Sequence, residues 1–345
     1  MKHLTIILTS AALALSVLNA YASPKDGNEF KETALSGTPV RMDIPDTPIN
    51  SVISNNGHIV TLSKIEDREA GSVSSSVSVY SVKEEDIVLK GTLSLPDVSI
   101  FDKIMLFPTD AEGCICGVSV MSTNRFYGIT GTVELKELEA LEQQTKGHVF
   151  NYSFTAPVCL LDGYFYFLEV GDDSNYSLNR TEDDGTIKPV CYLNKTGGEW
   201  LPYLGAASGN GSTIVFGYSF YREILFLNTE TGKAVSTSFE EPGFSEELAR
   251  NLQGDILESQ RRYYGGYIHV GKRVFLENLD GFIFASGEDT PDAILDVFSI
   301  SGKPMERLLL DRSGHCAVDE RGGRIFLFTY GDNPGLFVYH YRTEQ

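Results

Sequence analysis

Four consecutive residues, Arg261-Arg262-Tyr263-Tyr264, form the strongest local signal for ligand chemistry in the sequence. Guanidinium groups offer paired N–H donors that match anions, and tyrosine rings stack on ligands while their hydroxyl groups form hydrogen bonds. In an acidic protein this combination indicates a site for an anionic or sugar-like ligand. The alternative is that the tyrosines pack between neighbouring sheets and that the arginines pair with nearby acids such as Glu258.

Histidines are the second group of candidates. Beyond residue 22 the chain carries His58, His148, His269, His315 and His340. His315 comes at the start of a predicted inner strand, where it could face a central channel and bind a ligand; the alternative is a structural hydrogen bond to a loop. The sequence contains no His-Glu-x-x-His, no Gly-x-Ser-x-Gly and no phosphate-binding Gly-x-x-x-x-Gly-Lys-Ser/Thr loop. No catalytic residue is therefore assigned.

Two clusters of carboxylates fall in predicted turns. They are Asp172-Asp173 with Asn175, and Glu182-Asp183-Asp184 with Gly185. Calcium takes about six to eight oxygen ligands of this kind, but neither stretch fits the twelve-residue calcium loop with its distal glutamate. Acids that are solvated in turns are the alternative. We expect no cofactor, with calcium left open.

The first 22 residues have the pattern of an export signal. Lys2 and His3 precede an apolar run from Leu4 to Leu18, and small residues flank Tyr21 at the expected cleavage point. The run is shorter than the roughly 20 residues that span a bilayer. An uncleaved anchor helix is the alternative. The sequence therefore predicts an exported protein, periplasmic or extracellular, that is not inserted in a membrane. No cysteine precedes Cys114, so a lipoprotein is not expected.

The five cysteines give no clear disulfide framework. An odd number leaves at least one thiol unpaired, and Cys114 and Cys116 lie two apart in a strand-like run, which places them on the same side. Export would permit disulfides. We interpret the cysteines as small buried hydrophobic residues.

Composition narrows the classes of partner. The 345 residues carry 28 Lys and Arg against 47 Asp and Glu, a formal net charge of −19. Nucleic acids and anionic lipids require a concentrated basic face, so neither is an expected partner. The 42% of hydrophobic residues is typical of a folded globular protein.

Repeated groups of short strands must position these residues. One unit contains strands at 281–286, 293–300 and 305–311, and the next contains strands at 315–319, 324–330 and 336–341. Units with the same order of strand types recur upstream: an apolar first strand is followed by aromatic-rich or alternating strands. One such sheet cannot bury both of its faces, whereas sheets stacked in a ring can. Residues 23–345 divide into six units of about 54 residues.

The sequence therefore predicts an all-β, six-bladed β-propeller of four-stranded antiparallel blades, with 23–345 as a single domain after a cleaved segment 1–22. The last unit lacks its outer strand, and residues 38–43 near the N-terminus are expected to supply it and close the ring. Short helices are expected at 134–144 and 244–253, in loops between blades. A two-sheet β-sandwich is the alternative fold.

The stretch 295–304, which reads Leu-Asp-Val-Phe-Ser-Ile-Ser-Gly-Lys-Pro, carries a family resemblance. Together with Leu310-Asp-Arg312, Ala317-Val-Asp-Glu320 and Arg324-Ile-Phe-Leu-Phe328, it resembles the TolB-like six-bladed propellers of exported bacterial proteins. The match covers about the last 85 residues. The resemblance implies a propeller fold and an exported protein, and it implies no established reaction. Many relatives look like lipoproteins, from which this chain departs.

These observations favour a binding or scaffold module without catalysis. The expected partner is an envelope protein, a peptide or a glycan, recognised by loops on one face of the ring, and the expected state is a monomer. The alternative is an enzyme at the channel mouth, of the metal-dependent lactonase or polysaccharide-lyase kind, which would collect acids, His and Arg from several blades. A purely structural envelope component is a third possibility.

Overall fold

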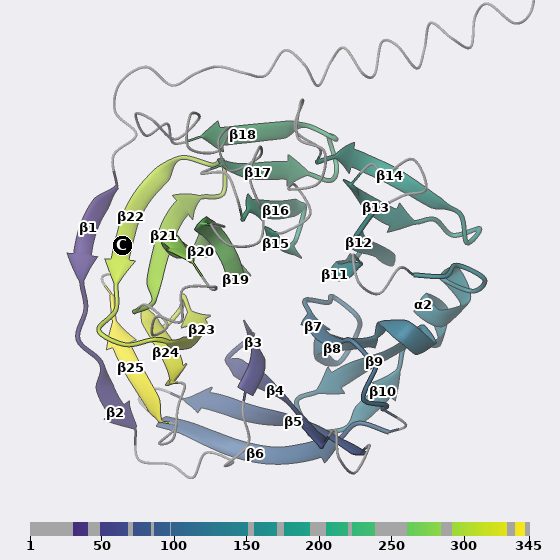
Figure 1. Cartoon of the computed structure of the whole chain (residues 1–345), viewed down its shortest axis with the longest axis horizontal. Helices are drawn as coiled ribbons and strands as arrows, with labels where there is room; N and C mark the ends of the chain where they lie inside the picture. The colour runs from purple at the N-terminus through teal and green to yellow at the C-terminus, as the bar shows by residue number, and fades with distance from the viewer. Residues whose placement is uncertain are drawn as a thin grey trace, which may run out of the picture.

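The architecture is a ring of six β-sheets (Figure 1). The computed structural model describes residues 30–40, 49–67, 72–83, 86–96, 98–150, 155–170, 176–193, 205–219, 223–238, 261–283, 292–329 and 335–341. The predicted export signal at 1–22 and the predicted helix at 244–253 lie outside these residues.

Consecutive strands pair antiparallel within each blade, from an inner strand at the centre of the ring to an outer one at its edge. The first three blades are built from β3 (Ile49–Asn55), β4 (His58–Asp67), β5 (Ser72–Lys83) and β6 (Asp86–Ser94); β7 (Ile104–Phe107), β8 (Cys114–Val120), β9 (Arg125–Thr130) and β10 (Leu135–Glu137); and β11 (Ala156–Leu161), β12 (Tyr164–Val170), β13 (Tyr176–Thr181) and β14 (Ile187–Tyr192). This antiparallel order lets short turns link successive strands.

The other three blades follow the same order. They comprise β15 (Gly205–Asn210), β16 (Thr213–Tyr218), β17 (Glu223–Asn228) and β18 (Ala234–Ser238); β19 (Arg261–Val270), β20 (Arg273–Ile283), β21 (Ile294–Ser299) and β22 (Pro304–Leu309); and β23 (Gly314–Asp319), β24 (Arg324–Thr329) and β25 (Leu336–His340). The predicted six-bladed, all-β fold is confirmed.

The N-terminal segment closes the ring, as the sequence predicts. Strand β2 (Thr38–Val40) pairs antiparallel with β25 and completes blade 6. A second strand, β1 (Lys31–Ala34), was not predicted: it adds to the outer edge of blade 5 in parallel with β22. Two neighbouring blades are thus held by one short stretch of chain, and both lose a free edge.

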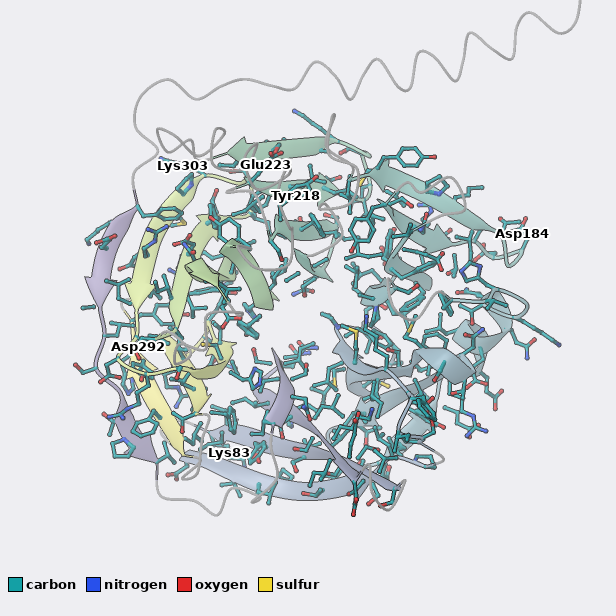
Figure 2. The ribbon with its side chains drawn as sticks, viewed as in Figure 1. Lys83, Asp184, Tyr218, Glu223, Asp292 and Lys303 are labelled. Atoms are coloured by element: carbon teal, nitrogen blue, oxygen red, sulfur yellow. The ribbon has the colours of Figure 1, made fainter. Side chains whose placement is uncertain are left out.

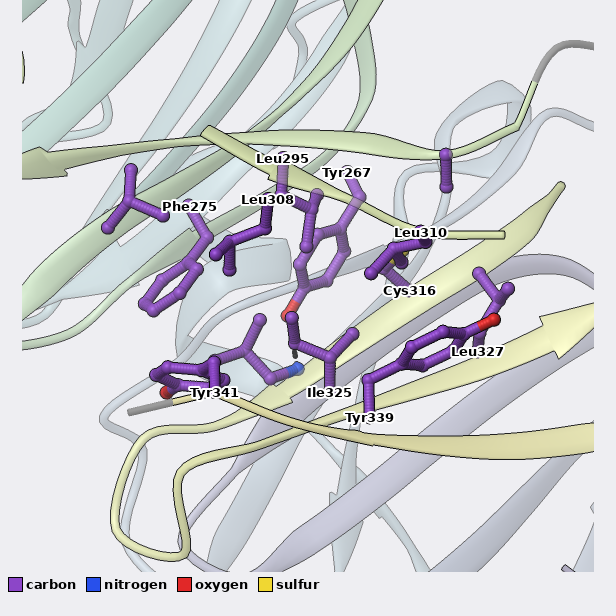
Figure 3. Close-up of a cluster of buried hydrophobic side chains, with 13 residues drawn as sticks. Tyr267, Phe275, Leu295, Leu308, Leu310, Cys316, Ile325, Leu327, Tyr339 and Tyr341 are labelled. Carbon is purple, nitrogen blue, oxygen red and sulfur yellow. Dashed lines mark hydrogen bonds between the residues drawn. The ribbon is translucent and has the colours of Figure 1, made fainter. Parts of the chain in front are cut away.

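Apolar side chains fill the spaces between blades. Both faces of a blade are covered by its neighbours, which explains why β24 is buried along nearly its whole length. Six hydrophobic clusters occupy the six interfaces. Between blades 5 and 6, Tyr267, Phe275, Leu327 and Tyr339 interdigitate (Figure 3). Each large apolar side chain buried in this way stabilises the fold by about 1.5–3 kcal/mol.

Helical structure is scarce in the described residues. The 3₁₀ helix η1 (Met121–Thr123) lies within blade 2, and the α-helix α2 (Glu139–Gln144) follows β10, between blades 2 and 3. The expected helix at 134–144 is therefore shorter than predicted, because Leu135–Glu137 pair with β9 as the outer strand of blade 2. The described helices are too short and too polar to span a membrane.

Candidate binding site at the turn face

One face of the ring is formed by the turns that connect each inner strand to the second strand of its blade. We call it the turn face, and its turns comprise residues 56–57, 108–113, 162–163, 211–212, 271–272 and 320–323. The sequence places Gly in each of these turns, and in most of them the backbone enters the left-handed region: Asn56 has φ 48° and Gly57 has φ 72°. Such tight turns end the inner strands abruptly and expose the side chains beside them.

A large cavity opens on the turn face, against blades 1, 5 and 6. Its volume is about 1870 Å³, and it is lined by the strand ends and turns around Asn55, His58, His269, Lys272 and Glu320. We call it the turn-face cavity. Most of its lining residues are polar or charged, although the strands behind them are apolar. Polar side chains occur here because the strand ends face the channel mouth rather than a neighbouring blade.

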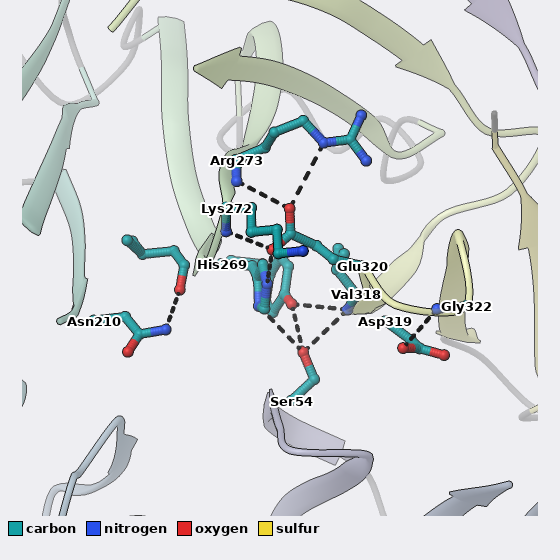
Figure 4. Close-up of polar contacts among 11 residues, drawn as sticks. Ser54, Asn210, His269, Lys272, Arg273, Val318, Asp319, Glu320 and Gly322 are labelled. Atoms are coloured by element: carbon teal, nitrogen blue, oxygen red, sulfur yellow. Dashed lines mark hydrogen bonds and ion pairs between the residues drawn. The ribbon is translucent and has the colours of Figure 1, made fainter. Parts of the chain in front are cut away.

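A hydrogen-bond network joins three inner strands at the edge of this cavity (Figure 4). The Ser54 hydroxyl on β3 lies 3.1 Å from the Tyr267 hydroxyl and 3.4 Å from His269 Nδ1, both on β19. The backbone N–H of Val318 on β23 donates to both hydroxyl oxygens, at 3.2 Å to Ser54 and 2.9 Å to Tyr267. Blades 1, 5 and 6 are thereby fixed relative to one another where they surround the cavity.

The Glu320 carboxylate is held at the centre of the site. It accepts backbone N–H bonds from Lys272 at 2.8 Å and Arg273 at 2.9 Å, and its oxygens lie 3.5 Å from His269 Nε2 and 3.6 Å from Arg273 Nε. Burial alone would raise the pKa of Glu320, but His269 and the two N–H donors outweigh it and lower the pKa. A side chain at Gly271 would overlap this carboxylate.

Asp319, a second carboxylate in the cavity, also has hydrogen-bond donors for both of its oxygens. Asp319 Oδ2 accepts hydrogen bonds from Arg324 Nη2 at 2.7 Å and Nε at 3.1 Å, and Asp319 Oδ1 accepts the N–H of Gly322 at 3.1 Å. On the opposite rim the Asn210 amide donates to the Val270 carbonyl at 2.9 Å. These bonds hold the turns in one conformation, so the cavity is preformed.

A smaller cavity of about 330 Å³ adjoins the first and shares Ser54, Asn55, Asn210 and His269 with it. Its charged lining residues are mostly acidic and come from blades 2, 3 and 4: Asp110, Asp162 and Glu230. Asp110 Oδ2 accepts the backbone N–H of Asp162 at 2.5 Å, which joins the turns of blades 2 and 3. The channel mouth therefore has an acidic side and a side with more cationic groups.

The sequence-predicted site residues occupy other positions. Arg261, Arg262 and Tyr263 begin β19, at the end of that strand remote from the turn face, and their side chains lie outside the described residues. Tyr264 is 2% exposed in the interface between blades 4 and 5, and its hydroxyl donates to Asp296 Oδ2 at 3.2 Å. A ligand-binding role for these four residues stays a prediction.

His315 lies at the start of inner strand β23, as predicted. Its Nε2 atom is 2.8 Å from the Ile49 carbonyl oxygen, which matches the structural alternative of a hydrogen bond to a neighbouring segment. Burial lowers the pKa of His315, although the bond to Ile49 works in the opposite direction. It lines neither of the two cavities described above.

The two predicted carboxylate clusters are the remaining site candidates from the sequence. Asp172 and Asp173 lie outside the described residues. Glu182 pairs with Arg180 at 3.0 Å and Lys188 at 3.4 Å, and Asp184, at the outer edge of blade 3 in Figure 2, accepts bonds from Thr186. Within the described ranges, no group of three or more His, Cys, Asp or Glu side chains is placed to hold a metal ion.

Sequence reasoning did not find the residues that build the turn-face cavity. In the sequence His269 stands apart from the other histidines, and Glu320 belongs to the stretch that carries the family resemblance. One usable signal was present: polar residues stand directly before short Gly-containing turns, in Ser54 to Gly57 and again in His269 to Gly271. The sequence does not show that these turns meet at one face.

Comparison with known proteins supports the fold. No model of a protein family matches the chain, and no curated protein is significantly similar to it. Among solved structures, a Bacteroides fragilis protein taken to be exported aligns with a TM-score of 0.51 at 10% identity, over 90% of this chain and 95% of that one. Streptogramin B lyase aligns with a TM-score of 0.46 at 12% identity, over 89% and 97%. A calcium-binding protein, regucalcin from Agrobacterium tumefaciens, aligns at 0.43 and 11% identity, over 90% and 95%.

At 10% identity and a TM-score of 0.51, the similarity to the Bacteroides fragilis protein supports a shared fold and says nothing about chemistry. The class of protein defined by fold and site is therefore a six-bladed β-propeller with a polar cavity on its turn face.

Proposed function

We propose that this chain is an exported, TolB-like propeller that binds a segment of a partner protein in the turn-face cavity and performs no reaction on it. In this proposal residues 1–22 direct export, and the propeller works in the periplasm or outside the cell. The TolB-like resemblance of the last two blades and the signal-like N-terminus support this part of the proposal.

The size of the turn-face cavity is the observation that carries the binding role. Its volume of about 1870 Å³ exceeds the roughly 300–1,000 Å³ typical of small-molecule pockets. An extended peptide segment or a loop of a partner would fill a space of this size. The rigid blades would hold the recognition turns in place, and turns of this kind can vary in sequence without disturbing the core.

The state of the polar groups supports binding more than catalysis. Glu320 and Asp319 already have cationic and N–H partners, and the pKa of Glu320 is lowered, so Glu320 stays ionised near neutral pH. A general acid needs a raised pKa near the working pH. These two carboxylates are therefore better suited to hold turns than to transfer protons.

A cavity-blocking variant tests the proposal. Peptides selected on the purified protein should bind saturably, and Arg321→Trp, on an exposed turn at the cavity, should abolish that binding. Lys188→Trp, on the outer strand β14, is the control and should bind normally. Equal binding by both variants, or no saturable peptide at all, would contradict the proposal.

A channel-mouth enzyme is the second candidate. The observation that favours it is the approach of His269 Nε2 to Glu320 at 3.5 Å within a cavity large enough for a substrate. The described residues offer no third ligand for a metal beside this pair. Turnover of lactones or uronic-acid polysaccharides, with and without added calcium, and its loss in His269→Gln, would favour the enzyme.

A further inference from the structure

The charge of the turn-face cavity differs from that of the whole chain. Among the described residues, its lining contains four lysine and arginine side chains against three carboxylates, whereas the whole sequence has 28 against 47. His58, His269 and His340, three of the histidines beyond residue 22, also line it. A cationic surface on an acidic protein is a specific feature, because the average surface would carry the opposite sign.

Internal pairing decides which of these charges can reach a ligand. Arg324 and Asp319 neutralise each other at 2.7 Å. Glu320 is occupied by His269 and by the N–H groups of two residues, with Arg273 beneath it. The remaining acid of the described lining, Asp86, lies opposite Lys83 in the hairpin of β5 and β6.

Lys272 and Arg321 supply the positive charge that is left over. Both side chains are exposed, on the turn of blade 5 and the adjacent turn of blade 6. Among the described residues neither takes part in an ion pair, while the N–H of Lys272 helps to fix Glu320. A lysine and an arginine on fixed turns form a site for carboxylates. Because the hydrogen-bond network already orders these turns, binding does not have to supply the free energy of ordering their backbone.

The shape and the other lining groups distinguish peptide from glycan. Sugar rings bind well where aromatic side chains cover their C–H faces, and the described lining contains no Phe, Tyr or Trp. Asn55, Asn56 and Asn210 instead line it with amide groups. Asn55 and Asn210 each use one N–H on a backbone carbonyl, of Ile115 and Val270, and their amide oxygens and second N–H match the N–H and C=O groups of a peptide backbone.

Resting on the proposed function, we propose that the partner segment is an acidic peptide whose carboxylates bind Lys272 and Arg321. The acidic side of the channel mouth, with Asp110, Asp162 and Glu230, repels the same carboxylates. The acidic part of the peptide is therefore confined to blades 5, 6 and 1. Electrostatic attraction of this kind weakens as salt screens it.

Fluorescent peptides of alternating Glu and Gly, with a Gln-and-Gly version as comparison, test the charge preference. We expect the Glu peptide to bind at least tenfold more tightly at low salt, and its affinity to fall as salt is raised. The double variant Lys272→Glu/Arg321→Glu should lose at least tenfold in affinity. The control Lys90→Glu/Lys188→Glu changes the net charge equally on outer strands and should bind like the wild type.

Three outcomes would overturn the inference. Equal losses in both double variants would show an effect of net charge alone. Tighter binding of the Gln peptide, still blocked by Arg321→Trp, would leave the proposed peptide-binding function in place and refute the acidic class. Binding of an oligogalacturonate in preference to any peptide would show that the partner is an acidic glycan.

Discussion

Asp296 is fully buried between blades 4 and 5 and shows how this acidic chain uses some of its carboxylates. Its oxygens accept bonds from Arg307 Nε at 2.7 Å and Nη2 at 3.1 Å, from the Asn278 amide at 2.8 Å and from the Tyr264 hydroxyl at 3.2 Å. A buried carboxylate is tolerated when a cation and further donors compensate for lost hydration. Asp296 therefore orders the interior of the ring.

Substitutions in this cluster should have unequal effects. Asp296→Ala leaves the Arg307 guanidinium without its buried partner and should lower the free energy of unfolding by about 3–5 kcal/mol. Tyr264→Phe removes one of several donors and should cost about 1 kcal/mol. Urea denaturation measures both. If Tyr264→Phe instead abolishes ligand binding at unchanged stability, the sequence-predicted ligand role of Tyr264 is correct.

The Glu277 carboxyl group should make stability depend on pH. It is enclosed, although the residue as a whole is only partly buried, and it accepts the N–H of Tyr267 at 3.0 Å. Burial raises the pKa of Glu277 to about 7, so the folded state holds a proton that the unfolded state has released above about pH 4.5. Stability should therefore fall as the pH rises from about 5 to 8, by an amount on the order of 3 kcal/mol.

Glu277→Gln isolates this effect, because a glutamine oxygen can still accept the Tyr267 N–H. The difference in unfolding free energy between variant and wild type should grow as the pH rises through 7. Glu320→Gln provides a control of opposite sign. In the wild type the lowered pKa of Glu320 contributes stability at neutral pH, and this stability is lost on acidification. Parallel pH profiles for the wild type and Glu277→Gln would refute the assignment.

At the scale of the elements, the sequence predicted the buried strands of the last blade well, whereas β11, which is buried to a similar extent, has no counterpart among the predicted strands. The regions of β23, β24 and β25 were found from their apolar runs, and β2 from the missing outer strand of the last unit. Inner strand β3 was missed, because Ile49–Asn55 mixes three apolar residues with four polar ones and lacks the strict alternation of a half-buried strand. Of the strand expected at 281–286, residues 281–283 are the end of the longer β20, Arg273–Ile283, and residues 284–286 lie outside the described residues.

Strand β1 and the candidate site could not be predicted for a shared reason. Lys31–Ala34 is mostly exposed and has no strand pattern, and its position depends on the edge that β22 offers. Ser54, His269 and Glu320 likewise belong to segments far apart in sequence. Their types suggest polar turns, but their convergence depends on how the ring closes.

Removal of the closing strands tests how much they contribute to the stability of the ring and to its protection against association. Deletion of residues 30–35 removes β1 and the contact of Phe30 with Arg307 at 4.9 Å, and should leave a monomer of somewhat lower stability. Deletion of residues 30–40 also removes β2, which exposes the edge of β25 and should lower stability by several kcal/mol and promote association. Light scattering and thermal unfolding measure both changes. Indistinguishable behaviour of the two deletions would show that β2 does not hold the ring closed.

The whole molecule is held by noncovalent packing at its six interfaces. All five cysteines are free thiols, and Cys116, Cys159 and Cys316 are buried. The interpretation of the cysteines as small buried hydrophobic residues holds for these three, whereas Cys114 and Cys191 are only partly buried. Burial raises the pKa of all three buried thiols, and a thiol that stays protonated is a poor nucleophile.

Thiol chemistry should therefore report global unfolding. We expect Cys116, Cys159 and Cys316 to resist iodoacetamide in the native protein and to react fully in denaturant, as seen by mass spectrometry of peptides. A reducing agent should leave the thermal midpoint unchanged. A lower midpoint on reduction, or blocked thiols that reductant releases, would reveal a disulfide and contradict this expectation.

The clasp made by β1 and β2 has a consequence for how the chain folds. Thr33 bonds to Glu306, 273 positions away, so the contacts of the clasp are among the most distant in sequence, and contacts of this kind form slowly. A ribosome releases the N-terminus first, and residues 31–40 must wait without their partners until residues 304–340 have been made. Both waiting strands are short, β1 carries charges and β2 carries Pro39, features that discourage pairing with other chains during synthesis.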